Sequence, residues 1–150
     1  MDQFDKMLAK YQPVALSLFR FFTGLLLFQY GIAKIFKFPV LPYFANIPPL
    51  ITAAGAIELV LGALLMVGLF TRISAFILSG EMAFAYFMGH APQGFWPVLN
   101  QGTPAILFCF LFLYFSAAGP GAFALSNLFH SWNATRIDGF GAHHEPLHSR

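Results

Sequence analysis

The sequence predicts an all-α integral membrane protein, a bundle of four membrane-spanning helices followed by a short interfacial helix. Of its 150 residues, 58% are hydrophobic and 9% are charged, whereas a soluble domain carries about 25% charged residues. Among 14 charged side chains (8 Lys and Arg, 6 Asp and Glu), only six fall within residues 11–135. A soluble fold of this size could not cover its surface with so little charge.

Four apolar runs, separated by glycine, proline and asparagine, supply the helices. A spanning helix needs about 20 mostly apolar residues. The spans are expected at about 14–33, 50–70, 72–89 and 103–118. Pro13 suits the first turn of the first span, and Thr103 with Pro104 suits the start of the last. Residues 119–121, Gly-Pro-Gly, end the fourth run.

These spans divide the chain and indicate its orientation. We expect a cytoplasmic N-terminal segment at 1–12, the helical domain at 13–121, an interfacial segment at 122–133 and a mobile cytoplasmic tail at 134–150. Lys and Arg favour the cytoplasmic side of membrane proteins. With four spans, one side holds Lys6, Lys10, Arg72, Arg136 and Arg150, and the other holds Lys34 and Lys37. This bias predicts that both termini are cytoplasmic.

Charge and composition also exclude several kinds of partner. A formal net charge of +2 without a Lys/Arg cluster predicts no nucleic-acid binding. A single cysteine, Cys109, excludes an internal disulfide and a CxxC redox pair. No flavin, haem or iron–sulfur motif is present, so we expect no covalently bound cofactor. We also expect no metal site, and the histidines at 143, 144 and 148 belong to a solvated tail.

Three charged residues fall inside the expected spans, namely Arg20, Glu58 and Glu81. Such residues are costly in a membrane, so each needs a partner or a cavity. At about 1.5 Å per residue, both glutamates lie roughly 15–18 Å from the turn near Phe70, at a similar depth. We therefore expect an interior Arg20–Glu58–Glu81 cluster as the candidate catalytic site. The alternative is an ion pair that only fixes helix register.

Small residues share the faces that carry these charges. Arg20, Gly24, Leu27, Gly31 and Lys34 follow one another at helical spacing, as do Gly55, Glu58 and Gly62. Glycines at such spacing allow two helices to approach closely. One arginine can balance only one of the two carboxylates. We expect Arg20 to hold Glu58 ionised, and Glu81 to be protonated near neutral pH.

A second group of candidates lies at the outer ends of the spans. An aromatic loop follows His90, with a phenylalanine and a tryptophan between two prolines. The candidate ligand-binding residues at this outer rim are Lys34, Tyr86, His90, Trp96 and Asn100. The imidazole of His90 is expected to face a ligand, or otherwise to anchor the loop at the membrane interface.

Four stretches of the chain resemble the DoxX family of small bacterial membrane proteins. They read RFFTGLLLFQYGIAKIF, GAIELVLGALLMVGLFTR, GEMAFAYFMGHAPQGFWPVLNQG and LFCFLFLYFSAAGPG. The resemblance covers about residues 16–128 and implies four helices in a bacterial inner membrane, with a role as an oxidoreductase subunit or its partner. Members often carry an acidic residue before the fourth helix, whereas this chain has Asn100-Gln101-Gly102-Thr103.

The leading hypothesis is a redox-linked subunit that binds a quinone or another lipophilic carrier and relays protons. A quinone needs an apolar slot and proton donors near its carbonyls. Electrons would come from a peripheral or membrane redox enzyme. The alternative is a non-catalytic anchor or scaffold for such an enzyme. A pathway for protons or small solutes is a third class, and a homo-oligomer stays open.

Overall fold

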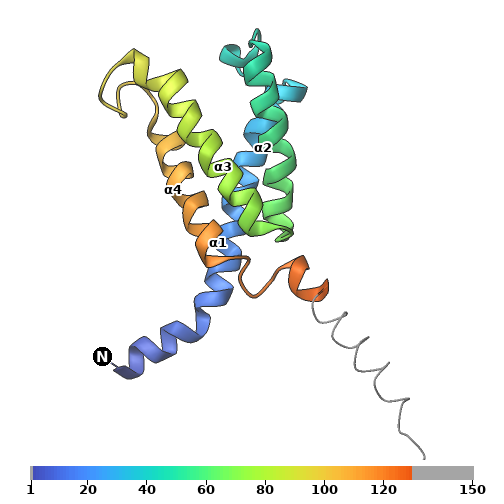
Figure 1. The fold of residues 1–150 in the computed structure, drawn as a ribbon, viewed down its shortest axis with the longest axis vertical. Helices are drawn as coiled ribbons and strands as arrows, with labels where there is room; N and C mark the ends of the chain where they lie inside the picture. The colour runs from blue at the N-terminus through green and yellow to red at the C-terminus, as the bar shows by residue number, and fades with distance from the viewer. Residues whose placement is uncertain (1, 130–150) are drawn as a thin grey trace, which may run out of the picture.

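The computed structural model describes residues 2–129, and every regular element in that range is helical. Four of its helices are long, and Figure 1 shows them running up and down one bundle. They are α1 (Asp2–Phe36), α2 (Pro49–Val67), α3 (Thr71–Ala85) and α4 (Thr103–Ala118). Shorter turns lie at η1 (Pro42–Phe44), at the π-helical η2 (Tyr86–His90) and at η3 (Ala91–Gln93).

The positions of these helices agree with the residue ranges expected for the four spans, except at the N-terminus. The fourth span, expected at 103–118, matches α4, and the third continues from α3 into η2 up to His90. The first helix, expected to begin near residue 14, instead begins at Asp2 and contains Pro13 within it. Proline removes one backbone hydrogen bond and bends a helix more readily than it ends one when helix-forming residues precede it. Figure 1 shows this bend, where the N-terminal part of α1 turns away from the bundle.

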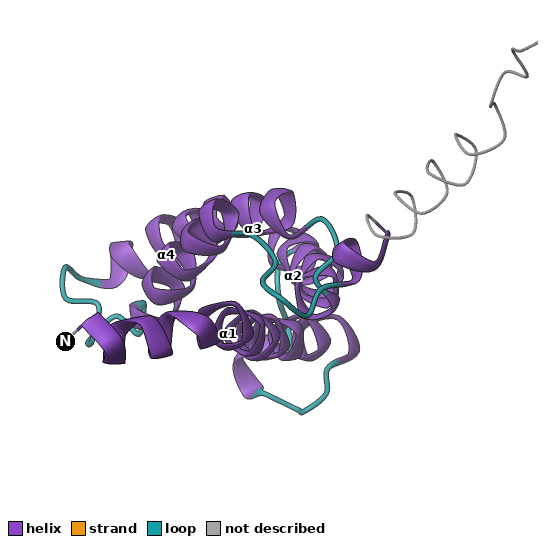
Figure 2. Cartoon of the chain, turned by 90° about the horizontal axis from the view of Figure 1, so that it is seen from below, coloured by secondary structure: helices purple, strands orange, loops and turns teal. Residues whose placement is uncertain are grey.

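The helices pack as two antiparallel pairs. Contacts are densest between α1 and α2 and between α3 and α4, whereas α1 and α4 barely meet. Figure 2 shows how α1 to α4 are arranged, seen from below. Glycines bring α1 and α2 together as expected: a Cβ on Gly31 would lie 2.6 Å from the backbone nitrogen of Leu59. Gly24 lies in the same way against Gly62 and Met66. The first pair therefore has a close and fixed register.

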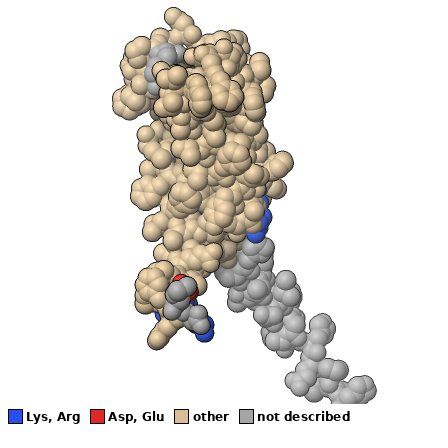
Figure 3. Space-filling model, turned by 90° about the vertical axis from the view of Figure 1, so that its left-hand side faces the viewer, with Lys and Arg blue, Asp and Glu red and all other residues tan. Residues whose placement is uncertain are grey.

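The bundle is apolar both inside and outside. Its core consists of Leu27, Leu65, Ala75, Leu78, Met82, Phe112 and Phe115. The face drawn in Figure 3 carries almost no charge between its ends, and many large hydrophobic side chains are exposed on the helices. Two helices, at Gln3–Phe36 and Pro49–Val67, are long and apolar enough to cross a membrane, and Thr103–Ala118 is apolar but shorter.

The bundle has two different ends. The hairpin end comprises the turn at 68–72 and the segment at 119–124, and the loop end comprises the connections at 37–48 and 86–102. After the hairpin end a helix begins at residue 125 and continues to 129, within the interfacial segment expected at 122–133. Residues 130–133, the tail at 134–150 and its histidines lie outside the described residues.

Candidate functional site

Arg20 lies at the hairpin end, not in the expected cluster with the glutamates. Its side chain is 2% exposed, and within residues 2–129 its guanidinium donates only to backbone carbonyls. Nε donates to Pro120 at 2.8 Å, Nη2 to Phe123 at 2.6 Å, and Nη1 to Met66 at 2.8 Å and to Leu65. The carbonyls of Leu65 and Met66 belong to the last turn of α2, where a cation is favourable. The expected pairing of Arg20 with Glu58 was wrong.

The register of α1 on α2 explains where Arg20 lies. Gly24 lies against Gly62 and Met66, so Arg20, one turn before Gly24, reaches the end of α2. Helical side chains tilt toward the N-terminus of their own helix. In antiparallel helices Arg20 therefore points toward the hairpin end while Glu58 points toward the loop end. The two side chains diverge.

Lys34 takes the place expected for Arg20. Its Nζ lies 2.6 Å from Glu58 Oε1, with side-chain exposures of 12% and 3%. The same tilt that separates Glu58 from Arg20 turns Glu58 and Lys34 toward each other. Gly55 makes room for the lysine stem, because a Cβ there would lie 2.6 Å from Lys34 Cβ. Lys34 Nζ also lies 5.6 Å from the ring centre of Phe44.

Glu81 is the third member of this interior group. Both of its carboxyl oxygens are buried without a hydrogen-bond partner among the described residues, and so is Glu58 Oε2. The charges of Glu58 and Lys34 are close enough to act on Glu81. The two glutamates therefore lie near one another, as expected. We call Lys34, Glu58 and Glu81 the carboxyl cluster.

The residues expected at the outer rim hold a loop in place rather than line one pocket. Asn100 is 3% exposed; its Nδ2 donates to Gly94 O at 2.7 Å, and its Oδ1 accepts from Gly102 N at 2.8 Å. His90 Nδ1 lies 2.9 Å from the Asn100 carbonyl, so Nδ1 carries the hydrogen. These bonds fix the connection between η2 and α4.

The two remaining rim residues face different surroundings, and Lys34 belongs to the carboxyl cluster. Trp96 is exposed and its ring meets that of Phe95 edge-on at 5.2 Å. The Tyr86 ring packs against Gly102, because a Cβ on Gly102 would lie 2.6 Å from a carbon of that ring. Of the five expected rim residues, Tyr86, His90 and Asn100 therefore lie together beside Gly102, and Trp96 and Lys34 do not join them through any contact described above.

Arg72 is a structural residue that the sequence indicated only as an orientation signal. Its Nη1 donates to the carbonyls of Ser116 at 3.0 Å and Ala117 at 2.6 Å. These carbonyls end α4, as Leu65 and Met66 end α2. Each helix pair thus has an arginine from its first helix at the C-terminus of its second. The sequence signal for this role was a lone arginine in one helix together with a glycine at the C-terminal end of the helix that pairs with it.

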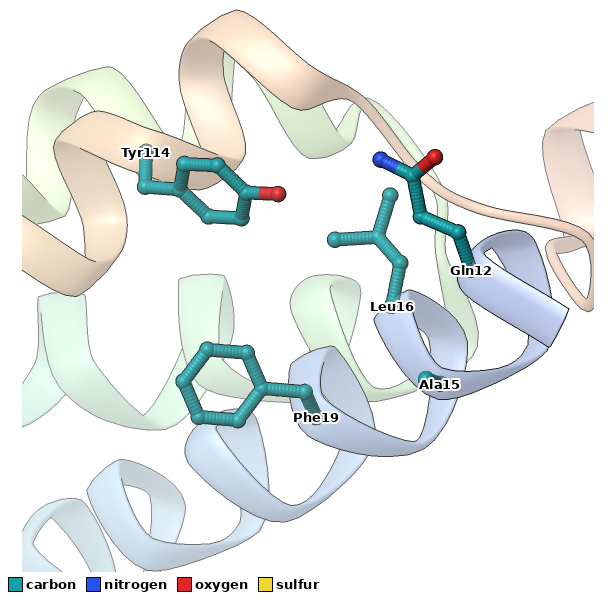
Figure 4. Close-up of a pocket in the computed structure, with 5 residues that line it drawn as sticks. All are labelled: Gln12, Ala15, Leu16, Phe19 and Tyr114. Carbon is teal, nitrogen blue, oxygen red and sulfur yellow. The ribbon is translucent and has the colours of Figure 1, made fainter. Parts of the chain in front are cut away.

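An apolar groove of about 400 Å³ lies between α1 and α4, near the hairpin end. Figure 4 shows its five lining residues, with the Tyr114 ring on one side and the α1 side chains on the other. They are Gln12, Ala15, Leu16, Phe19 and Tyr114. Within residues 2–129, no group of three His, Cys, Asp or Glu side chains could hold a metal ion.

An all-helical bundle with an apolar exterior and interior carboxyl groups defines a helical membrane protein. The chain belongs to the DoxX family, whose profile matches residues 15–91, a stretch that contains the whole carboxyl cluster. It is similar to a Haemophilus influenzae protein described as uncharacterized, with 44% identity over 128 residues, which cover 81% of this chain and 96% of that protein. No solved structure matches.

Proposed function

We propose that the chain is a redox-linked membrane subunit that exchanges protons with a quinone or another lipophilic carrier. The buried carboxyl group of Glu81, without a partner beside the Lys34–Glu58 pair, carries this proposal. Glu81 is the group that takes up and releases the proton, and Glu58 with Lys34 sets the charge beside it.

Charge balance within the cluster supports a proton on Glu81. Two buried carboxyl groups share one ammonium group, and that group donates a hydrogen bond to Glu58. An additional uncompensated anion in so apolar a setting is strongly disfavoured. A neutral Glu81 removes that cost, and a carboxyl group that is neutral at rest can give up its proton when a reaction demands one.

The apolar groove supports a lipophilic carrier rather than a soluble substrate. Three of its five lining side chains are apolar, and the hydroxyl of Tyr114 and the amide of Gln12 offer hydrogen bonds. Tyr114 lies five residues before Gly119 and Glu81 ten after Thr71, so at about 1.5 Å per residue they are roughly one to two turns apart in depth. Reduction of a quinone consumes protons with the electrons, and these electrons come from a partner redox enzyme.

The proposal places four spans in a bacterial inner membrane with both termini in the cytoplasm. The hairpin end then faces the cytoplasm, where Arg20 and Arg72 lie, in accord with the positive-inside rule. Reaction of single introduced cysteines with a membrane-impermeant thiol reagent tests it. With Cys109 replaced by serine, a cysteine at Phe70, which is 64% exposed, should react only in inverted vesicles, and one at Gln93 only in intact spheroplasts; the opposite labelling overturns the orientation.

The redox role is tested with Glu81→Gln and the matched surface control Gln93→Glu. Both variants are purified in mild detergent, and extracted quinone is quantified per mole of protein; quinone-dependent electron flow is then measured in membranes. The control should resemble the parent. Glu81→Gln should keep the bound carrier and lose electron flow. A parent protein that retains no quinone and leaves electron flow unchanged when deleted contradicts the proposal.

A scaffold is the second candidate function, because the N-terminal part of α1 leaves the bundle with its side chains exposed. A pure scaffold needs no interior proton. Glu81→Gln would then leave the co-purifying enzyme, and its activity, as in the parent, whereas the redox proposal requires the activity to fall while the complex persists.

A further inference from the structure

The N-terminal part of α1, residues 2–12, carries an apolar stripe that nothing in the bundle covers. Phe4, Met7, Leu8 and Tyr11 are 60%, 52%, 51% and 58% exposed. Their spacing of i, i+3, i+4 and i+7 puts them on one face of the helix. Asp5, Lys6 and Lys10 occupy the other positions of the same turns. This part of α1 is therefore amphipathic.

The length of α1 requires its first turns to lie outside the hydrocarbon. At about 1.5 Å per residue, a helix of 35 residues is roughly 50 Å long, whereas the hydrocarbon core is about 30 Å thick. The excess of roughly 20 Å corresponds to the part before Pro13. Figure 1 shows that part bent away from the bundle axis.

The stripe continues the outer face of the bundle. Beyond Pro13 the same face of α1 carries Leu18, Phe22 and Leu26, which are all exposed. These residues follow Phe4, Leu8 and Tyr11 at intervals of whole turns along one continuous helix. Because the exterior of the bundle contacts acyl chains in a membrane, the part before the bend presents its apolar face in continuity with a lipid-facing surface.

We propose that residues 2–12 form a membrane-surface helix. Its Phe4, Met7, Leu8 and Tyr11 insert among the acyl chains, just below the lipid headgroups. The partner of this apolar face is phospholipid, whether its headgroup is zwitterionic or anionic. The two Asp and two Lys of residues 2–12 cancel, so the attraction comes from apolar burial and not from anionic lipid. Helices of this kind lie in the plane of the interface.

The test uses the full-length protein with Cys109 replaced by serine and one nitroxide label, at Leu8→Cys or at the matched polar position Lys6→Cys. The protein is reconstituted into phosphatidylcholine vesicles, with and without phosphatidylglycerol. Spin relaxation then measures collision with oxygen, which concentrates in lipid, and with a water-soluble nickel chelate. The label at position 8 should show an oxygen-to-nickel ratio several-fold higher than the label at position 6, with little change on adding anionic lipid or salt.

Three other outcomes overturn the proposal. Equal and high nickel access at both positions means a helix free in water. Protection of position 8 from both reagents means a protein contact, and dipolar broadening between labels would identify a second copy. A ratio at position 8 that rises only with phosphatidylglycerol means electrostatic attachment. A parallel Phe4→Trp variant with Trp96 and Trp132 replaced by phenylalanine, read by the depth of fluorescence quenching with brominated lipids, keeps the test valid if labelling perturbs the helix.

Discussion

Arg20 and Glu81 both have ionisable side chains inside an apolar bundle, and their surroundings are opposite. The guanidinium of Arg20 donates to four carbonyls at the hairpin end. The carboxyl group of Glu81 is buried with no partner for either oxygen among the described residues. A fully hydrogen-bonded charge stabilises one arrangement of the chain, whereas an unsatisfied polar group costs stability and is kept for another reason. By this difference Arg20 is a structural residue and Glu81 is a candidate functional residue.

The largest expected effect comes from removing the arginine. Arg20→Met removes the hydrogen bonds that the guanidinium donates to Leu65, Met66, Pro120 and Phe123. Among these four carbonyls, that of Leu65 still accepts from the backbone N–H of Gly68. The free energy of unfolding should fall by about 3 kcal/mol or more, since hydrogen bonds to charged groups contribute ~1.5–3 kcal/mol each. Denaturation in mixed detergent micelles measures it. Arg72→Met is the matched comparison, with a loss of about 1 kcal/mol, because Arg72 bonds exposed carbonyls. Equal losses of unfolding free energy in the two variants would contradict the expectation that Arg20 stabilises the fold more than Arg72 does.

The glycine register that separates Arg20 from the cluster can be broken directly. Gly31→Ala puts a methyl group 2.6 Å from the backbone of Leu59. The helices must move apart, at a cost of about 1–3 kcal/mol. Gly80→Ala is the control, because a Cβ there meets nothing within 4 Å, and it should gain up to ~1 kcal/mol from helix propensity. If Gly31→Ala is neutral in the same unfolding assay, the close packing does not hold the register.

Loss of the carboxylate partner of Lys34 should have a smaller effect. Glu58→Gln strands the ammonium group, but Lys34 lies two residues from the end of α1 and can extend toward the loop end. We expect a loss of about 1–2 kcal/mol, below the ~3–5 kcal/mol for a fully buried pair. Lys34→Met in the same chain should restore most of it. A double-mutant cycle with no coupling between the two positions would contradict the pair.

Most of the fold was predictable because it follows from hydrophobic length and helix breakers. Counting residues from the turn near Phe70 was enough to place Glu58 and Glu81 together. The cation was assigned wrongly because depth alone ignores the direction in which a side chain leaves its helix. The tilt of Cβ toward each N-terminus favours Lys34 over Arg20, and this signal was present in the sequence.

Other features could not be obtained from spacing. The hydrogen bonds of Asn100 depend on how the loop at 94–102 folds back on itself, and no periodic pattern encodes that path. The groove beside Tyr114 exists because α1 and α4 barely meet, which is a property of the whole bundle.

The smallest expected effect on stability is at Glu81. Among the described residues, neither carboxyl oxygen of Glu81 has a hydrogen-bond partner. Replacing this carboxyl by an isosteric amide should therefore change the free energy of unfolding by less than about 1 kcal/mol. Its chemical effect should be complete. If Glu81 carries the proton of the carboxyl cluster, infrared spectra of the parent at neutral pH contain a protonated carboxyl band that shifts on deuteration. That band should disappear in Glu81→Gln and persist in Arg20→Lys, which leaves both glutamates in place. A band that is absent from the parent, or that survives Glu81→Gln, assigns the proton elsewhere and leaves Glu81 without a role in proton exchange.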